Sequence, residues 1–204
     1  MQRYDELMFT PAVQALQDVE GAREMYARSY GARTRPLGED DIGFITSRTS
    51  FYMASVSETG WPYVQHRGGP AGFLKVIDDH TLAFADYKGN KQHISHGNVA
   101  SDDRVSLFLM DYPRKARMKL QGHARFEEAV DNPDLAAQVA SDGQGRVERV
   151  VTIKLVAFDW NCPQFITPRF DAGEIAQLVG PEMDNLNARI AELEAENAAL
   201  RGAG

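Results

Sequence analysis

The stretch from Trp61 to Lys91 combines cationic, aromatic and glycine residues. Arg67 and Lys75 flank a run of small residues, Gly68 to Gly72, whose missing side chains would let a ligand approach the backbone closely. Further along, Gly89-Asn90-Lys91 stands at the start of a predicted helix, where free backbone N–H groups, the positive helix end and a lysine would meet. A phosphate monoester requires this combination, so the stretch predicts a phosphate-bearing ligand.

The histidines and Cys162 are the other side chains that could take part in catalysis or bind a metal. His93 and His96 are three residues apart on a predicted helix, but no carboxylate or third ligand accompanies them at a metal-binding spacing, so we expect no metal site. An imidazole is suited to proton transfer near neutral pH, so His66, beside Arg67, is the catalytic candidate. An ordinary strand histidine is the alternative. No neighbouring residue supplies a base for Cys162, which we interpret as structural.

The elements that would position these residues are short β-prone runs. Seven runs follow one another from Phe51 onward, rich in β-branched and aromatic residues and separated by turn residues. They are FYMASVS, PYVQHR, FLKVI, TLAFAD, RVSLFLM, ARMKLQGHARF and RVVTIKLVAF. The sixth run carries Arg117 and Lys119, which would add positive charge to the predicted site if the fold brings that strand alongside.

The connections between the runs indicate the type of sheet. Glu58-Thr59-Gly60 and Asp78-Asp79-His80 fit tight turns between antiparallel neighbours, and residues 90–101 and 132–141 have helical patterns. A doubly wound parallel sheet would need a helix at nearly every crossover. The sequence therefore predicts a mainly β fold, an antiparallel barrel with peripheral helices.

Helical signals precede the strands. Thr10-Pro11 supplies an N-cap and a proline at the first helical position for a helix that continues toward Tyr30. A breaker-rich linker, Gly31–Gly38, follows. The acids Glu39–Asp41 then favour the start of a short helix that runs through Ile45.

The C-terminal region repeats apolar residues at heptad spacing. The a positions hold Met183, Ile190 and Asn197, and the d positions hold Leu186, Leu193 and Leu200. Ile at a, Leu at d and a single Asn at a are typical of a parallel two-stranded coiled coil. In that pairing Arg189 would face the partner's Glu194, and Glu196 would face the partner's Arg201. We expect a dimer zipper; the alternative is an amphipathic helix folded back on its own barrel.

Length and composition bound the remaining possibilities. With 204 residues, we expect an N-terminal helical segment over residues 1–36, the barrel domain over 37–172 and the C-terminal helix over 173–204. The formal net charge of −7 argues against a nucleic-acid partner. The start of the chain has no signal-peptide pattern and no apolar run is long enough to span a bilayer, so we expect a cytoplasmic protein with no membrane partner. Cys162 is the sole cysteine, which excludes an intrachain disulfide.

In this order the motifs resemble the FMN-binding split β-barrel family related to pyridoxamine 5'-phosphate oxidase. The resemblance rests on the runs SETGWPYVQHRGGP, GFLKV, FADYKGN, DRVSLFLMDYP and FDWNCPQ followed by ITPRF, and it covers roughly residues 37–171. It implies an antiparallel split barrel and a homodimer that binds two FMN molecules at the subunit interface.

The resemblance also implies roles for individual residues. Lys75 and Lys91 look like ligands of the flavin phosphate, with Arg67 as a further cation. Ala85 and Asp86 lie where the family uses a strand end to contact the cofactor.

Three more positions follow from the resemblance. Arg117 stands where the family commonly has Gln, while Trp160 and Arg169 look like the C-terminal pair that reaches the flavin from the partner subunit. A cation beside flavin N1, the role implied for Arg169, would stabilise the reduced anionic flavin.

This sequence also departs from the family pattern. True pyridoxamine phosphate oxidases carry an Arg-Lys pair where this chain has Lys91-Gln92, so Gln92 offers only a neutral hydrogen bond. Phe165 and Thr167 occupy the positions of an Arg-x-His element that holds the pyridoxal substrate. We therefore expect an FMN-dependent oxidoreductase that acts on another small molecule or accepts electrons from a donor, and not a source of pyridoxal phosphate.

Two other functions stay open. The same barrel would bind haem or store flavin without turnover, with His66, His93 or His123 as an axial ligand of the haem. Alternatively the barrel is a platform, and the C-terminal zipper binds another protein.

Overall fold

The computed structural model describes residues 1–30, 35–160 and 163–202. The chain divides into two compact units. The first, here called the body, comprises Met1–Asp111 and Ala116–Gln164. The second, the C-terminal unit, comprises Tyr112–Lys115 and Phe165–Gly204.

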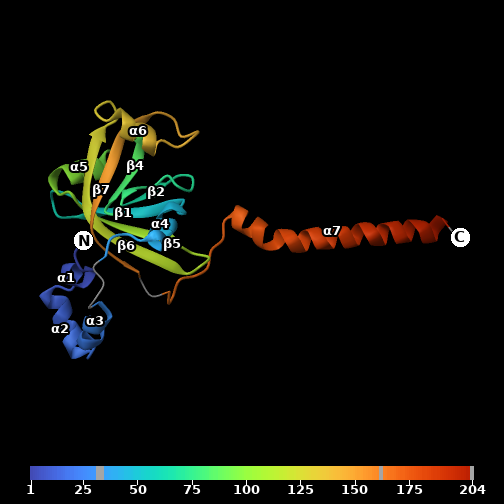
Figure 1. Cartoon of the computed structure of the whole chain (residues 1–204), viewed down its shortest axis with the longest axis horizontal. Coiled ribbons are helices and arrows are strands. Elements are labelled where there is room, and N and C mark those ends of the chain that lie inside the picture. The colour runs from blue at the N-terminus through green and yellow to red at the C-terminus, as the bar shows by residue number, and fades with distance from the viewer. Residues whose placement is uncertain (31–34, 161–162, 203–204) are drawn as a thin grey trace. The chain divides into compact units, whose positions relative to one another are not determined.

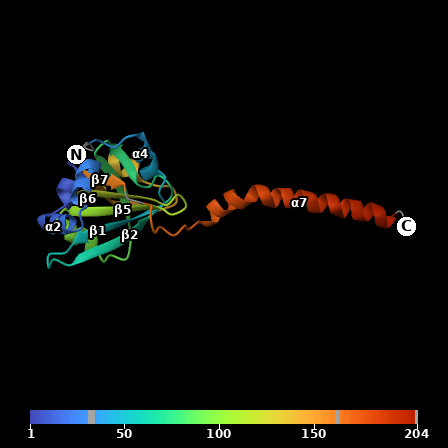
Figure 2. The same ribbon diagram turned by 90° about the horizontal axis from the view of Figure 1, so that it is seen from below.

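The body is built on a seven-stranded antiparallel sheet (Figure 1). Its strands are β1 (Ser50–Val56), β2 (Pro62–Gly68), β3 (Lys75–Asp78), β4 (Thr81–Tyr87), β5 (Arg104–Asp111), β6 (Ala116–Glu128) and β7 (Val147–Trp160). They pair in the order β2-β1-β5-β6-β7-β4-β3. In Figure 2 the labelled strands from β2 to β7 can be seen in this order. The mainly β, antiparallel prediction is confirmed. The sheet is not hydrogen-bonded all the way round, because no ladder within the described residues joins the edge strands β2 and β3.

Alternating side chains give the sheet two faces. In β1, Phe51 and Met53 are buried, whereas Tyr52 and Val56 on the opposite face are exposed. The face that carries Phe51 is called the inner face here. Inner-face residues of all strands except β2 join residues of the neighbouring helices and loops in the main core.

Six helices accompany the sheet within the described part of the body. They are α1 (Tyr4–Met8), α2 (Pro11–Val19), α3 (Arg23–Tyr30), α4 (Glu39–Thr46), α5 (Ile94–Ser101) and α6 (Pro133–Val139). The predicted cap of α2 is present, since Thr10 Oγ1 accepts a hydrogen bond from the Val13 N–H at 3.5 Å. The single helix predicted as far as Tyr30 is wrong, because Gly21 adopts a φ of 68° and separates α2 from α3. Residues 31–34 of the predicted linker lie outside the described residues.

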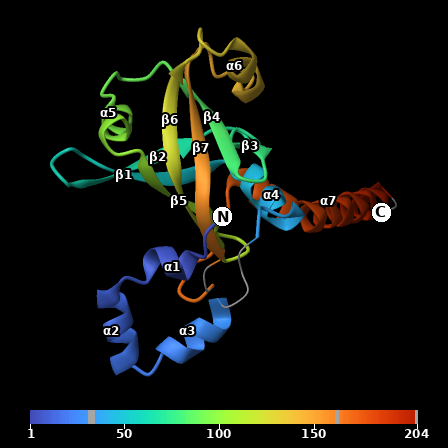
Figure 3. The ribbon, with the colours of Figure 1, turned by 60° about the vertical axis from the view of Figure 1, so that its left-hand side comes forward.

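The helices between strands begin where backbone geometry allows. The helix predicted over residues 90–101 starts only at Ile94, because Lys91 and His93 have φ values of 62° and 52° and cannot continue a right-handed helix. The helix predicted over 132–141 is α6, with the Asn132 side chain accepting a hydrogen bond from the Leu135 N–H at 3.3 Å. Figure 3 shows α6 beyond the ends of β6 and β7.

A second, smaller core lies under α6. Ala136 and Val139 of α6 pack on Ala83 of β4 and Val150 of β7. These strand residues face away from the main core, so α6 covers the outer face at this end of the sheet.

The C-terminal unit contains one long helix, α7 (Ala172–Gly202). It begins before Met183, where the heptad pattern starts, and continues through Pro181. The predicted seam residues Leu186, Ile190 and Leu193 are 40–53% exposed in the single chain. Among the described residues no helix combines the length and the apolar character needed to cross a membrane.

Candidate functional site

A cavity of about 280 Å³ opens on the inner face of the sheet, beside the main core. Six of the ten catalytic and cofactor-binding residues predicted from the sequence line it: His66, Arg67, Ala85, Asp86, Lys91 and Gln92. They come from β2, from the end of β4 and from the loop that leads into α5. Segments that are separate in the sequence therefore meet at one site.

Strand register directs Arg67 and Asp86 into this cavity. Arg67 pairs with the buried Phe51 across the β1–β2 ladder, and Asp86 lies two residues after the buried Phe84. Cross-strand partners, and residues two apart in a strand, share a face of the sheet. The two side chains consequently meet, and Nη1 of Arg67 donates to Oδ1 of Asp86 at 3.1 Å.

A second arginine completes the cluster. Arg149 is the partner of Asp86 across the β4–β7 ladder, and its Nε donates to Oδ2 of Asp86 at 2.9 Å. Arg149 also lines the cavity, although no motif in the sequence points to it. It lies in the last β-prone run, outside any cationic motif, and only the strand pairing brings it to Asp86.

Arg67 retains an unused donor. Among the described residues, no group accepts a hydrogen bond from its buried Nε, and its guanidinium lies 5.5 Å from the ring centroid of Phe84. A buried donor without an acceptor costs about 1–3 kcal/mol. An acceptor on a ligand in the cavity would remove this cost.

The loop before α5 holds an unusual backbone. Lys91 and His93 both adopt left-handed conformations, and the Gln92 N–H donates to the Asn90 side chain at 3.1 Å. Left-handed conformations are costly for residues with a side chain, and they gather at ligand-binding loops. Here they bring the first turn of α5 to the cavity, and no side chain in the described part of the chain caps its N–H groups.

Polar contacts fix α5 in this place. Ser95 Oγ donates to Gln65 Oε1 at 2.7 Å, and Asn98 Nδ2 donates to Ser55 Oγ at 3.0 Å. Both acceptors belong to β1 and β2. The uncapped helix end is thereby held beside Arg67.

The histidines divide into two groups. His66, His93 and His96 line the cavity, and the ring of His96 stacks on Phe126 with centroids 4.8 Å apart. His123 does not line it and instead pairs with Asp103 through Nδ1 at 2.7 Å.

Other residues implied by the resemblance lie away from the cavity. Lys75 pairs with Ala83, whose side chain packs in the smaller core under α6, so Lys75 lies on the outer face. Arg117 pairs with Met110 and faces outward as well. The predicted meeting of Arg67, Lys75 and Lys91 is therefore seen for Arg67 and Lys91 alone.

The C-terminal pair divides between the two units. Trp160 belongs to the body and is fixed there, since its Nε1 donates to Oδ1 of Asp41 at 2.8 Å. Arg169 belongs to the C-terminal unit, where its guanidinium lies over the ring of Tyr112 at 4.9 Å. Cys162 lies outside the described residues.

Asp41 is the buried anchor of Trp160. Burial alone would raise the pKa of this carboxyl, but hydrogen bonds from Arg35, from the Gly38 N–H and from Trp160 together outweigh burial and hold the pKa below its usual value. Asp41 therefore stays ionised.

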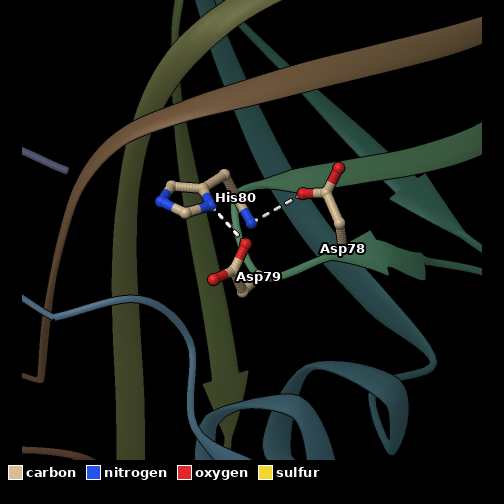
Figure 4. A group of neighbouring side chains, drawn as sticks. All are labelled: Asp78, Asp79 and His80. Carbon is tan, nitrogen blue, oxygen red and sulfur yellow. Dashed lines mark hydrogen bonds and ion pairs between the residues drawn. The ribbon is translucent and has the colours of Figure 1, made fainter.

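The turn between β3 and β4 gathers Asp78, Asp79 and His80 (Figure 4). Oδ1 of Asp78 accepts a hydrogen bond from the His80 N–H at 2.8 Å, and the His80 ring contacts the Asp79 carboxylate. Turn hydrogen bonds explain this arrangement, and the tight turn predicted here is confirmed.

The chain was compared with protein-family models, with curated proteins and with solved structures. Residues 42–155 match the family model described as pyridoxamine 5'-phosphate oxidase. No curated protein matches the chain.

Three solved structures illustrate the similarity. A putative pyridoxamine 5'-phosphate oxidase from Lactobacillus delbrueckii has 20% identity and a TM-score of 0.49, with 63% of this chain and 97% of that chain covered. HupZ from Group A Streptococcus has 14% identity and a TM-score of 0.48, with 66% and 100% covered. An FMN-binding protein from Syntrophomonas wolfei has 9% identity and a TM-score of 0.43, with 71% and 97% covered.

Proposed function

The chain belongs to the pyridoxamine 5'-phosphate oxidase family, and on that premise we propose that it is an FMN-binding oxidoreductase that acts on a small molecule. The cavity on the inner face would hold the phosphate of FMN. When bound, FMN supplies hydride and electron transfer.

The buried Nε of Arg67 is the observation that carries this proposal. It offers a donor that lacks an acceptor among the residues that the structure describes, at the wall of a cavity that Lys91 and the start of α5 also line. A phosphate oxygen is a strong acceptor for a guanidinium, an ammonium and helix N–H groups. Gln92 adds a neutral amide at the same wall.

The size of the cavity supports a site that a second copy completes. About 280 Å³ lies just below the range of about 300–1,000 Å³ for pockets that enclose a drug-sized ligand. His66 and Arg67 face opposite ways on the edge strand β2, yet both line the cavity, so it reaches around this edge. We propose that the phosphate end of FMN lies inside and that the flavin ring extends past β2.

An exposed apolar surface lies on the outer side of this edge. Tyr52 and Val64 are 40% and 60% exposed, and Trp61 at the tip of the β1–β2 hairpin is 76% exposed. A second copy of the chain would cover this surface in a homodimer. Arg117 lies on the same outer face and would approach the cofactor from there.

The remaining residues of the resemblance would act across the dimer. Lys75 and Trp160 of the body do not line its cavity, and we propose that these two residues and Arg169 of the C-terminal unit meet the cofactor held mainly by the other subunit. The α7 helices of the two chains would pair through their exposed heptad seam as a parallel coiled coil.

The substrate would not be pyridoxamine phosphate. Phe165 and Thr167 stand where that substrate's ligands are expected, and neither offers a cation for a second phosphate.

Absorbance spectroscopy of the purified protein tests this function. We expect the purified protein to bind FMN and to show the absorbance spectrum of a flavin. Arg67→Ala and Lys91→Ala should each weaken FMN binding by about tenfold to a hundredfold, because each removes a charge-assisted hydrogen bond. Lys154→Ala is a matched control, since Lys154 is an exposed lysine of β7 that does not line the cavity.

Three results would contradict the proposal. One is a colourless protein that ignores added FMN. Another is a Soret band after haem addition that disappears on His66→Ala or His93→Ala, which would favour the haem alternative. The third is an equal loss in the Lys154→Ala control.

A further inference from the structure

Asp86 lies between two arginines that hold it differently. Arg149 places both Nε and Nη2 on Oδ2 of Asp86, each at 2.9 Å. Arg67 reaches Oδ1 with Nη1 alone, at 3.1 Å. All three side chains are 12–16% exposed, so solvent screens their contacts only in part.

The two arginines also differ in the number of carboxylates that pair with them. Besides Asp86, Arg149 has the carboxylates of Glu148 at 3.4 Å and Glu128 at 3.8 Å. Arg67 has Asp86 as its only salt-bridge partner among the described residues, and its Nε has no acceptor. Arg149 is thus compensated by protein carboxylates, whereas Arg67 keeps donor capacity and positive charge at the cavity wall.

From this arrangement we propose that Arg149 is a positioning residue that keeps Arg67 available for a phosphate. By holding Oδ2, it prevents Asp86 from turning both oxygens toward the Arg67 guanidinium. This inference rests on the proposed function, because the phosphate in question is that of FMN.

The reason lies in the geometry of the two groups. A carboxylate and a guanidinium pair best through two parallel hydrogen bonds, and Asp86 is already within reach of Arg67. Without Arg149, Asp86 would form that pair and occupy the donors that a phosphate needs. The carboxylate would then repel the phosphate as well.

Comparing FMN with riboflavin isolates this effect. Riboflavin has the same ring and ribityl chain but no phosphate, so the ratio of the two dissociation constants reports the phosphate site alone. At one fixed ionic strength, we expect Arg149→Gln to reduce the preference for FMN about tenfold or more while riboflavin affinity stays nearly unchanged. Adding Asp86→Asn to that variant should restore the preference, because an amide does not neutralise Arg67.

Two variants guard against trivial explanations. Arg125→Gln removes the same charge from an exposed arginine of β6 that does not line the cavity, and it should leave the ratio unchanged. If Arg149→Gln does not fold, Arg149→Lys keeps the charge but has one donor group for Oδ2. It should show a smaller loss that Asp86→Asn again reverses.

The outcomes separate this inference from the proposed function. An unchanged ratio in Arg149→Gln overturns the positioning role. So does a loss that Asp86→Asn fails to reverse, which would assign Arg149 to direct phosphate contact. If the unmodified protein binds FMN no better than riboflavin, the phosphate site itself is wrong and both proposals fall.

Discussion

Asp41 illustrates how one buried carboxylate connects distant residues. It accepts hydrogen bonds from the Gly38 N–H at 2.9 Å and from Trp160 Nε1 at 2.8 Å, and it also pairs with Arg35. The start of α4 and the end of β7 are fixed together by this side chain. Trp160 would therefore meet a cofactor only through the part of its ring that Asp41 and Phe44 leave exposed.

Asp41→Asn should lower the free energy of unfolding by about 1–3 kcal/mol at neutral pH. It removes charge-assisted hydrogen bonds at a buried position, and Arg35 contributes less because it is half exposed. Denaturant unfolding monitored by tryptophan fluorescence measures the change. Asp40→Asn, in the exposed neighbour, should have little effect.

The pH dependence of that difference follows from the lowered pKa of Asp41. Because the folded-state pKa lies below the unfolded value of about 3.9, the stabilisation is fully present above that value. It is lost as the pH falls through the folded-state pKa. The difference in the free energy of unfolding between the unmodified protein and Asp41→Asn should therefore disappear in acid. A difference that stays constant down to pH ~2 would contradict this role of Asp41.

Residue patterns and the family resemblance together anticipated part of the cavity. Arg67, Asp86 and Lys91 were singled out, and all three line it. Arg149 was missed, because its role depends on a ladder partner more than sixty positions away in the sequence. Lys75 was grouped with Arg67 by proximity in the sequence, but strand alternation places it on the other face.

Among the elements, the paired strands β6 and β7 contain the most restrictive glycine. A Cβ at Gly122 would lie 2.7 Å from the Lys154 carbonyl oxygen, at the position where the ladder shifts register. Backbone atoms of a central strand cannot move aside easily.

Gly122→Ala should consequently destabilise the body by about 1–3 kcal/mol. Gly97→Ala in α5 is its opposite, because a Cβ there meets nothing within 4 Å and alanine favours the helix by about 0.5–1 kcal/mol. Thermal unfolding followed by circular dichroism distinguishes the two variants. Equal changes in stability would contradict the crowded environment of Gly122 and the open environment of Gly97.

Element types were more predictable from the sequence than element ends. Alternation and turn residues located all seven strands, because a half-buried strand imposes a period of two on its side chains. The start of α5 was placed too early, since nothing in the sequence marks Lys91 and His93 as left-handed. Closure of the sheet depends on whether β2 and β3 pair, and local patterns carry no information on that contact.

At the scale of the whole molecule, α7 is the 31-residue helix that carries the heptad seam. None of its described residues is buried, and Asn197 donates to the carbonyl of Leu193 within its own helix at 3.2 Å. An isolated helix with an apolar seam gains stability chiefly by pairing. The sequence predicted its heptads, and the partner stays a prediction.

A cysteine at Leu200 tests parallel pairing. In a Cys162→Ser background, Leu200→Cys places two thiols opposite each other at d of a parallel, in-register coil, and oxidation should yield a covalent dimer on non-reducing gels. Ala199→Cys, one residue earlier and outside the seam, should crosslink far less. An antiparallel pair, or α7 bound to another protein, would leave Leu200→Cys monomeric.

The alternation of faces at Ala85 and Asp86 in β4 determines which sequence changes this site can tolerate. A one-residue deletion upstream in β4 would move Asp86 to the position of Ala85 beneath α6 and Tyr87 to the position of Asp86, so that a phenol ring and not a carboxylate would lie between the arginines. Relatives that diverge here should therefore vary by replacement, while gains or losses of single residues collect in the turn at Glu58–Gly60 and beyond the ends of the sheet.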